Sequence, residues 1–512
     1  MRDISMERVN ATRNTILGII KDKKLTHEQK INSLAGQADG LLEVLALPEG
    51  LEERMNVSVE EKVICDLNEG HAPMRPRYII PDYDKFMREG SEFLQLAPPQ
   101  DIWEAVNSLL IFYKHVPSIT NFPVYIGSID KLLEPFIQDE AEAKKAIRLF
   151  LTHIDRTILD SFCHANIGPE DTKAGRIIME LDRELQNAVP NLTLKYDPDI
   201  TPDDYAEMAA GTALISAKPS FGNHKMFVNE LGEDYVVASC YNGLKLGGGS
   251  YTLCRILLGN LAKKADGIED FMNRALPESL EIMAAYMDER IRFIVEESGF
   301  FESNFLAKEG FIHKDRFTAM FGLVGLAECV NLLFEKEGKT GRFGNCKEAD
   351  DLGVAIIEAI DKFNAGHENV NCSITDNHFL LHAQVAIDSD VNSSPGCRIP
   401  IGEEPENLVD HLNHCGRFHK YFPSGIGDIF PIEVTAQKNP AFIVDLVKGS
   451  FAKDVRYLSF YSSNSDVVRI SGYLVKRSEM EKLKAGSNVL QDTTHLGVGA
   501  STNLHVLDRK VR

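Results

Sequence analysis

Apolar residues recur at three- and four-residue spacing in several long stretches of the chain, which is the period of an amphipathic helix. The clearest case begins at Pro277, where Leu280, Met283, Met287 and Ile291 fall on one face. The same spacing predicts further helices over residues 28–45, 203–217 and 352–360. The most apolar stretch, 319–334, is shorter than a membrane span and predicts a buried helix.

Short runs of β-branched and aromatic residues separate these helical stretches, a composition typical of strands. The runs are Tyr78–Ile80, Leu192–Tyr196, Asp234–Cys240 and Arg456–Phe460. Helices and strands interleave without a 20- to 50-residue repeat, so we expect an α/β, barrel-like body and not a solenoid or propeller.

Three segments are expected along the chain, although no long polar linker separates them. Residues 1–50 predict a helical lead-in that ends at the Gly- and Pro-bearing turn of Pro48–Gly50. Residues 51–430 form the main body. Residues 431–512 form a C-terminal subdomain with a soft boundary.

Charge and cysteine usage narrow the classes of partner. Lys and Arg total 55 against 76 Asp and Glu, a formal charge of -21 that repels nucleic acid and anionic membranes. A small-molecule partner is expected instead. Nine cysteines without C-x-x-C pairs, and an N-terminus without a signal-peptide pattern, favour a cytoplasmic protein.

A single glycine, Gly472, ends the strand-like sequence D-V-V-R-I-S-G-Y. Glycine can hold a backbone radical because its α-carbon flattens between amide and carbonyl, whereas a side chain would crowd that arrangement. The commoner use of such a glycine is a bulge or a turn. This tripeptide alone therefore leaves both interpretations open.

In the sequence E-D-Y-V-V-A-S-C-Y-N-G, a β-rich run ends just before Cys240, so we expect Cys240 at the end of a strand. Sulfur suits hydrogen-atom relay because its S–H bond is close in strength to an activated C–H bond. The alternative is a small buried hydrophobic residue, which is the commoner fate of a cysteine. The following Gly247–Ser250 predicts a flexible connection, since no G-K-S/T sequence supports a phosphate loop.

These segments together resemble the glycyl radical enzymes. V-R-I-S-G-Y is similar to the R-V-x-G-Y radical signature, D-Y-V-V-A-S-C to the cysteine loop, and P-N-L-T-L-K-Y at Pro190–Tyr196 to a strand upstream of that loop. V-I-C-D-L-N-E-G-H-A-P, H-A-N-I-G-P and F-G-L-V-G-L-A-E resemble the YjjI family. The resemblance implies an α/β fold with a ten-stranded barrel of two antiparallel five-stranded half-barrels surrounded by helices.

The resemblance also implies roles for residues and partners. Gly472 would store the radical in the C-terminal subdomain, and Cys240 would become the thiyl radical that attacks substrate. A separate radical S-adenosylmethionine activating enzyme would install the radical after translation. No dissociable cofactor and no metal is expected, and we expect a homodimer.

Two departures from the better-known relatives bear on the reaction. Ser239 precedes Cys240, so the adjacent thiol pair of the formate-lyase type is missing, and Asn242 stands where dehydratases and decarboxylases have a carboxylate. A base must come from elsewhere. The candidates lie in stretches that look like the family pattern: Glu328, Asp66, Glu69, His71 and His164. Glu328 could equally be a charged residue on a helix surface.

Three functions stay open. The first is lyase or dehydratase chemistry, in which hydrogen is abstracted from a small polar metabolite. The second is a reductase of a sugar-like or nucleotide-like substrate assisted by Cys65, although the zinc-binding cysteines of anaerobic ribonucleotide reductases are missing. The third is a metabolite-binding barrel without catalysis.

Four donor residues near the C-terminus have a spacing that invites comparison with a metal site: His411, His414, Cys415 and His419. A zinc site usually offers a cleaner paired pattern. We therefore expect solvated loop residues here.

Overall fold

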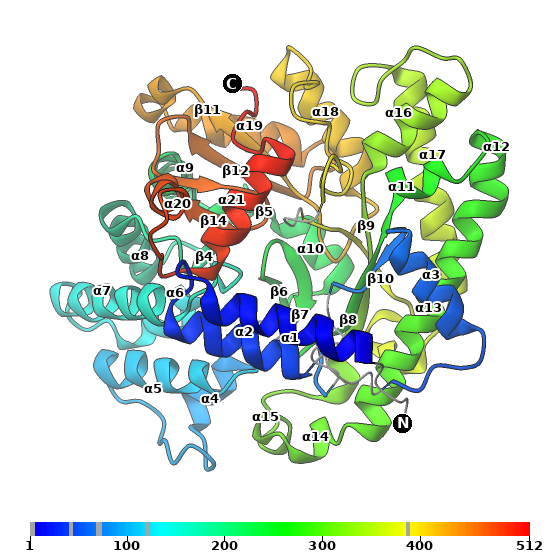
Figure 1. Cartoon of the computed structure of the whole chain (residues 1–512). Coiled ribbons are helices and arrows are strands. Elements are labelled where there is room, and N and C mark those ends of the chain that lie inside the picture. The colour runs from blue at the N-terminus through cyan, green and yellow to red at the C-terminus, as the bar shows by residue number, and fades with distance from the viewer. Residues whose placement is uncertain (1–5, 40–44, 68–73, 118–121, 386–389) are drawn as a thin grey trace.

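The computed structural model describes residues 6–39, 45–67, 74–117, 122–385 and 390–512. Its helices surround the strands (Figure 1). The longer helices are α1 (Met6–Lys21), α2 (His27–Asp39), α3 (Leu51–Glu60), α4 (Tyr83–Glu89), α5 (Ile102–Lys114), α7 (Glu140–Thr157), α8 (Lys173–Leu185), α9 (Asp203–Ser216), α10 (His224–Leu231), α13 (Leu276–Arg292), α16 (Leu326–Lys336), α17 (Lys347–Gly366), α18 (Leu408–His419), α19 (Ala441–Phe451), α20 (Arg477–Lys484) and α21 (Asp492–Leu504). Short helices are α6 (Ile129–Leu133), α11 (Leu258–Lys263), α12 (Ile268–Asp270), α14 (Phe300–Ser303) and α15 (Phe305–Lys308).

Ten strands form two five-stranded sheets. The first sheet contains β1 (Ile64–Cys65), β2 (Tyr78–Ile80), β8 (Gly248–Leu257), β9 (Phe317–Val324) and β10 (Leu380–Ala383). The second contains β3 (His164–Ile167), β4 (Asn191–Tyr196), β5 (Ser220–Asn223), β11 (Asp428–Ile432) and β12 (Tyr457–Ser462). Two hairpins stand apart, β6 (Tyr235–Ala238) with β7 (Asn242–Lys245) and β13 (Val467–Arg469) with β14 (Leu474–Lys476).

Pairing within each sheet is mixed. In the first sheet β8, β9 and β10 are parallel, while β1 and β2 pair with β8 antiparallel. In the second, β3, β4 and β5 are parallel, and β12 joins β5 antiparallel. The expected α/β fold with two five-stranded halves is therefore confirmed. No strand pairing joins the two halves among the described residues.

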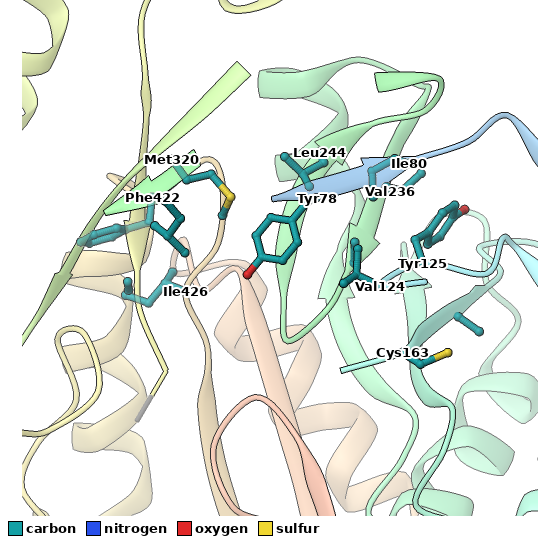
Figure 2. Packing of buried hydrophobic residues seen from close by; sticks show 14 of the residues in the cluster. Tyr78, Ile80, Val124, Tyr125, Cys163, Val236, Leu244, Met320, Phe422 and Ile426 are labelled. Carbon is teal, nitrogen blue, oxygen red and sulfur yellow. The ribbon is translucent and has the colours of Figure 1, made fainter. Parts of the chain in front are cut away.

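One large apolar core holds both sheets and the helices together. Figure 2 shows part of it, with Tyr78 of β2, Met320 of β9 and Val236 of β6 converging from separate segments. Cys163, next to the second sheet, belongs to the same cluster. Burial of this apolar surface is the main force that fixes the sheets relative to each other.

The helices predicted from apolar spacing at 203–217, 277–294 and 352–360 are confirmed as α9, α13 and α17. The stretch 319–334 is different, because it forms the end of β9 and most of α16. Gly325 between them has a φ of 76°, a left-handed conformation that favours glycine. An apolar run buried on all sides carries no period that separates strand from helix.

The predicted flexible connection at Gly247–Ser250 is also wrong, since β8 begins at Gly248. A Cβ on Gly248 would lie 2.0 Å from the Arg316 carbonyl oxygen, and one on Gly249 would lie 2.0 Å from the Tyr78 carbonyl oxygen. These glycines therefore permit close approach of neighbouring backbones and not flexibility.

Helix α2, in the N-terminal segment, contacts the C-terminal segment of the chain. The Gln29 side chain of α2 donates to the carbonyls of Val489 and Leu490, both at 3.3 Å. A second apolar cluster gathers β13, β14 and α21 around Ile470 and Tyr473. The boundaries at residues 50 and 430 stay predictions. No helix among the described residues is both long and apolar enough to cross a membrane.

Candidate active site

The structure brings Cys240 and Gly472 into contact. Cys240 follows β6, and Gly472 lies in the bend between β13 and β14. A Cβ built on Gly472 would lie 2.0 Å from the Cys240 Cβ and 2.7 Å from Cγ1 of Val385. Only a residue without a side chain fits there, because real Cβ atoms do not approach other atoms so closely.

Backbone geometry at Ser239 turns the chain so that Cys240 is presented. Ser239 has a φ of 55°, which is uncommon for a residue other than glycine. Its amide donates to the Val124 carbonyl at 2.8 Å. Just before the turn, the Asn166 amide side chain pairs with both backbone groups of Val237, at 2.8 and 2.9 Å.

His164 fixes the Ser239 carbonyl and is not a free base. Its Nδ1 lies 2.7 Å from that oxygen and must donate, so Nε2 accepts from Thr193 Oγ1 at 2.7 Å. Tyr457 in turn donates to Thr193 at 2.8 Å. Burial lowers the pKa of His164 to about 3. A neutral imidazole with both nitrogens in use is a positioning residue.

The Cys240 thiol is buried, and burial favours its protonated form. Its Sγ donates to Asn242 Oδ1 at 2.7 Å, and burial raises the thiol pKa to about 12. A protonated thiol is the form that can hand over a hydrogen atom, whereas a thiolate has none to give. Asn242 therefore accepts a hydrogen bond from the thiol.

Asn191 of β4 bridges two loops. The first, the cysteine loop, is Ser239–Tyr241 between β6 and β7, and the second, the glycine loop, is Ile470–Tyr473 between β13 and β14. The Asn191 Nδ2 donates to the Gly472 carbonyl at 3.1 Å and lies 3.4 Å from the Ser239 carbonyl. Its Oδ1 accepts from Arg469 at 2.9 Å. The P-N-L-T segment thus supplies two residues, Asn191 and Thr193, that position the two loops.

Two arginines remote in sequence also hold the glycine loop. Arg398 donates to the Gly427 carbonyl at 2.7 Å and to Ser471 Oγ at 3.4 Å. Arg509 donates to the carbonyls of Arg469, at 3.0 Å, and Ile470. Sequence reasoning missed both arginines, because an isolated arginine carries no motif.

Glu328 lies in the first turn of α16. It lines a cavity of about 460 Å³, and Arg398 and Arg509 line the same cavity. The Glu328 Oε1 accepts from the Ser394 backbone N–H at 2.9 Å and from the Ser394 hydroxyl at 2.7 Å. Burial raises the Glu328 pKa. Arg398 lines the cavity and also donates to Ser471, so it connects the cavity to the glycine loop.

Cys65 lies elsewhere, on β1, where its Sγ accepts from Arg255 at 3.9 Å. Arg255 forms a buried ion pair with Asp390, with a shortest distance of 2.6 Å. The base candidate Asp66 accepts from Tyr286 at 3.4 Å. Glu69 and His71 fall outside the described residues. Among the described residues no hydrogen bond joins Cys65 to Cys240, and the role of Cys65 stays a prediction.

The expectation of solvated loop residues near His411 is wrong, since His411, His414, Cys415 and His419 are buried on α18. Donor atoms of His411, Cys415 and Asp428 lie within 4.8 Å of one another. His419 donates to Asp428 at 3.0 Å, and Arg512 donates to His411 Nδ1 at 3.2 Å. These bonds engage Asp428 and the Nδ1 of His411, and the expected absence of a metal ion stays a prediction.

Solved structures with this fold are glycyl radical enzymes. The anaerobic ribonucleotide reductase of Thermotoga maritima matches with a TM-score of 0.70 and 10% identity, covering 95% of this chain and 99% of that chain. The B12-independent glycerol dehydratase of Clostridium butyricum matches with a TM-score of 0.69 and 11% identity, covering 100% and 89%. At such identity these likenesses establish the fold.

Sequence comparison defines the family within that class. The family model of glycyl radical enzyme YjjI-like proteins matches residues 25–512, and the chain belongs to that family. An uncharacterized protein of Haemophilus influenzae is 45% identical over 505 residues, covering 98% of both chains. The uncharacterized protein YjjI of Escherichia coli is 40% identical over 514 residues, covering 98% of this chain and 96% of its own.

Proposed function

We propose that this chain stores a radical on Gly472 and uses Cys240 to abstract hydrogen from a small polar metabolite. The contact between the two residues carries the proposal, since a Cβ on Gly472 would lie 2.0 Å from that of Cys240. A hydrogen atom can pass between groups that touch without either loop moving far. Complete burial of both keeps solvent away from the radical.

The relay balances in four hydrogen-atom transfers. The Gly472 α-carbon radical takes the hydrogen atom of the Cys240 thiol, which leaves a thiyl radical. The thiyl then takes hydrogen from a substrate C–H bond, re-forming S–H and a substrate radical. After rearrangement or bond cleavage, the product radical takes hydrogen back from the Cys240 thiol. The thiyl radical so formed takes the α-hydrogen of Gly472, which re-forms S–H and restores the glycyl radical.

Lyase or dehydratase chemistry is the reaction we favour. Ser239 beside Cys240 provides no second thiol for acyl transfer. The Asn242 side chain, which accepts from the thiol, has a buried Nδ2 with no hydrogen-bond partner. Such a donor suits a hydroxyl or carbonyl oxygen of a polar substrate, since an unpaired buried donor is costly. Glu328 is our candidate for the acid or base.

Reduction is the second candidate. Its support is the fold shared with anaerobic ribonucleotide reductases, together with Cys65 on a strand of the first sheet. Arg255 donates a hydrogen bond to the Cys65 sulfur at 3.9 Å. Formation of a reduced product, with consumption of an external reductant, would favour this reaction over elimination.

We also propose that a separate radical S-adenosylmethionine enzyme removes the hydrogen from Gly472, and that the protein works as a homodimer. The nine cysteines are all free thiols, which suits a reducing compartment such as the cytoplasm.

The test uses full-length protein activated anaerobically by its cognate activase. We expect an electron paramagnetic resonance doublet, because the Gly472 radical couples to its one remaining α-hydrogen. Cys240→Ser should keep the doublet and lose all turnover, since an O–H bond is too strong to replace the relay thiol. A metabolite screen with activated wild type supplies the substrate.

Cys372→Ser is the matched control, because Cys372 is equally buried but lies in the short helix Val370–Thr375, outside the cysteine and glycine loops. It should keep both doublet and turnover. Turnover by fully activated Cys240→Ser would remove Cys240 from the catalytic role.

A further inference from the structure

Three buried arginines gather around the glycine loop. Arg398, Arg469 and Arg509 are at most 9% exposed. Burial lowers the pKa of Arg469, and the charges of Arg398 and Arg509 lower it further. The three guanidinium groups therefore act on one another across a small region of low dielectric.

Carboxylates balance this charge poorly. Among the described residues, the sole ion pair of the three is Arg398 with Asp428, at 3.9 Å. Asp428 is already shared with His419, which donates to it at 3.0 Å. Arg469 and Arg509 donate to backbone carbonyls and an amide oxygen instead. A buried positive charge is costly unless a counter-charge pairs with it.

Two of these arginines face the 460 Å³ cavity at Glu328. Arg398 Nη2 is buried without a hydrogen-bond partner, and so is Glu328 Oε2. The cavity thus presents an unpaired cationic donor and an unpaired carboxyl oxygen. A polar ligand in the cavity would satisfy both atoms.

The acidic residues on the cavity wall are already engaged. Glu403 pairs with Arg342, with Nε–Oε2 at 3.0 Å. Glu404 accepts from the Gly402 amide at 2.7 Å, and Glu335 is exposed. Among the described residues none of them forms an ion pair with Arg398 or Arg509, although the charge of Glu404 acts on Arg509.

We propose that this cavity binds a small metabolite through a carboxylate group, which pairs with Arg398 and Arg509, while Glu328 hydrogen-bonds a polar group at its other end. Arg398 donates to Ser471, and Arg509 to the carbonyl of Ile470. The bound carboxylate therefore stabilises the glycine loop in contact with Cys240. A ligand of this volume, with few charged groups, matches ordinary metabolite sites.

The test needs no radical, so its failure is distinct from failure of the chemistry proposed for Gly472 and Cys240. Unactivated full-length protein is titrated by calorimetry with succinate, with inorganic phosphate, and with glycerol as a neutral probe of similar size. Succinate should bind saturably at millimolar concentration or tighter, and glycerol should not. Tighter binding of phosphate than of succinate would overturn the carboxylate assignment and indicate a phosphate ester as the ligand.

Arg398→Gln should weaken succinate binding at least tenfold. Arg274→Gln, which removes an exposed arginine paired with Asp270, is the matched control and should bind as wild type does. Hydrogen exchange of wild type gives a measurement that needs no variant, because succinate should protect amides in 392–404 and 503–509. Absence of saturable binding, or wild-type affinity in folded Arg398→Gln, would overturn the proposal. Protection confined to other segments would do the same.

Discussion

The two loops that meet at the candidate active site are held by different kinds of group. The cysteine loop is anchored by uncharged side chains of the second sheet, namely His164, Asn166 and Asn191. The glycine loop is anchored largely by the cations Arg398 and Arg509 from distant parts of the chain. Neutral hydrogen bonds tie Cys240 to the sheet, whereas Gly472 is held by Asn191 and, through its neighbours Ser471 and Ile470, by buried arginines.

This difference implies that the cysteine loop is held in a fixed position, whereas the glycine loop can adjust. The hydrogen bonds of the cysteine loop come from strands β3 and β4, whose backbones are paired along their length. The glycine loop instead depends on charged groups whose pairing changes with any anion in the neighbouring cavity. Access to the glycine would therefore respond to ligands, while the thiol stays in place.

The largest expected effect comes from breaking the contact itself. Gly472→Ala forces a Cβ to within 2.0 Å of the Cys240 Cβ, so the loops must separate. We expect complete loss of the stable electron paramagnetic resonance doublet, and a loss of unfolding free energy of about 1–3 kcal/mol, the usual cost of overpacking. Spectra of activated protein and denaturant titration measure the two effects.

Gly449→Ala is the control, because Gly449 has no atom within 4 Å of its ideal Cβ position. It should keep the doublet and be at least as stable as wild type, because alanine is favoured over glycine inside a helix such as α19. An undiminished doublet in Gly472→Ala would place the radical on another residue.

Dioxygen gives the second prediction, because a carbon-centred radical on the main chain adds oxygen and breaks the backbone. Activated wild type exposed to air should yield one fragment ending near Ser471 and another running from about Tyr473 to Arg512. Mass spectrometry of air-exposed wild type and Gly472→Ala measures the cleavage. Cutting at the same position in unactivated protein would indicate ordinary proteolysis instead.

The sequence predicted the parts of the fold that carry local signals. The β-rich run before Cys240 and the apolar spacing of α13 are visible without tertiary information. The resemblance to a known family anticipated that Cys240 and Gly472 meet. The stretch 319–334 was mispredicted because uniform burial removes the period that separates β9 from α16.

Residues that are distant in the sequence and meet only on folding could not be paired from sequence patterns. Arg398 and Arg509 are more than a hundred residues apart, yet both contact the glycine loop. His164 was named as a possible base, but the structure engages both of its nitrogens. The role of a polar side chain follows from which atoms are already bonded, and that information exists only in three dimensions.

The smallest expected effect concerns pH and the neutral anchor of the cysteine loop. An unfolded histidine takes up a proton near pH 6.5, whereas burial lowers the pKa of folded His164 to about 3. As the pH falls below about 6.5, the unfolded state therefore binds a proton that the folded state does not. Stability is fully present above that pH and falls by about 1.4 kcal/mol per unit below it.

His164→Gln removes this titration, so its stability should fall by about 1.4 kcal/mol less per pH unit than that of wild type between pH 6 and 5. Its stability at pH 7 should also be lower, because the hydrogen bond to Ser239 is weakened. Urea unfolding at pH 5 to 7 measures both. His313→Gln, at an exposed position, should keep the wild-type slope. An unchanged slope in His164→Gln would mean that His164 is already protonated in the folded protein, so that the cysteine loop, like the glycine loop, is held by a cation.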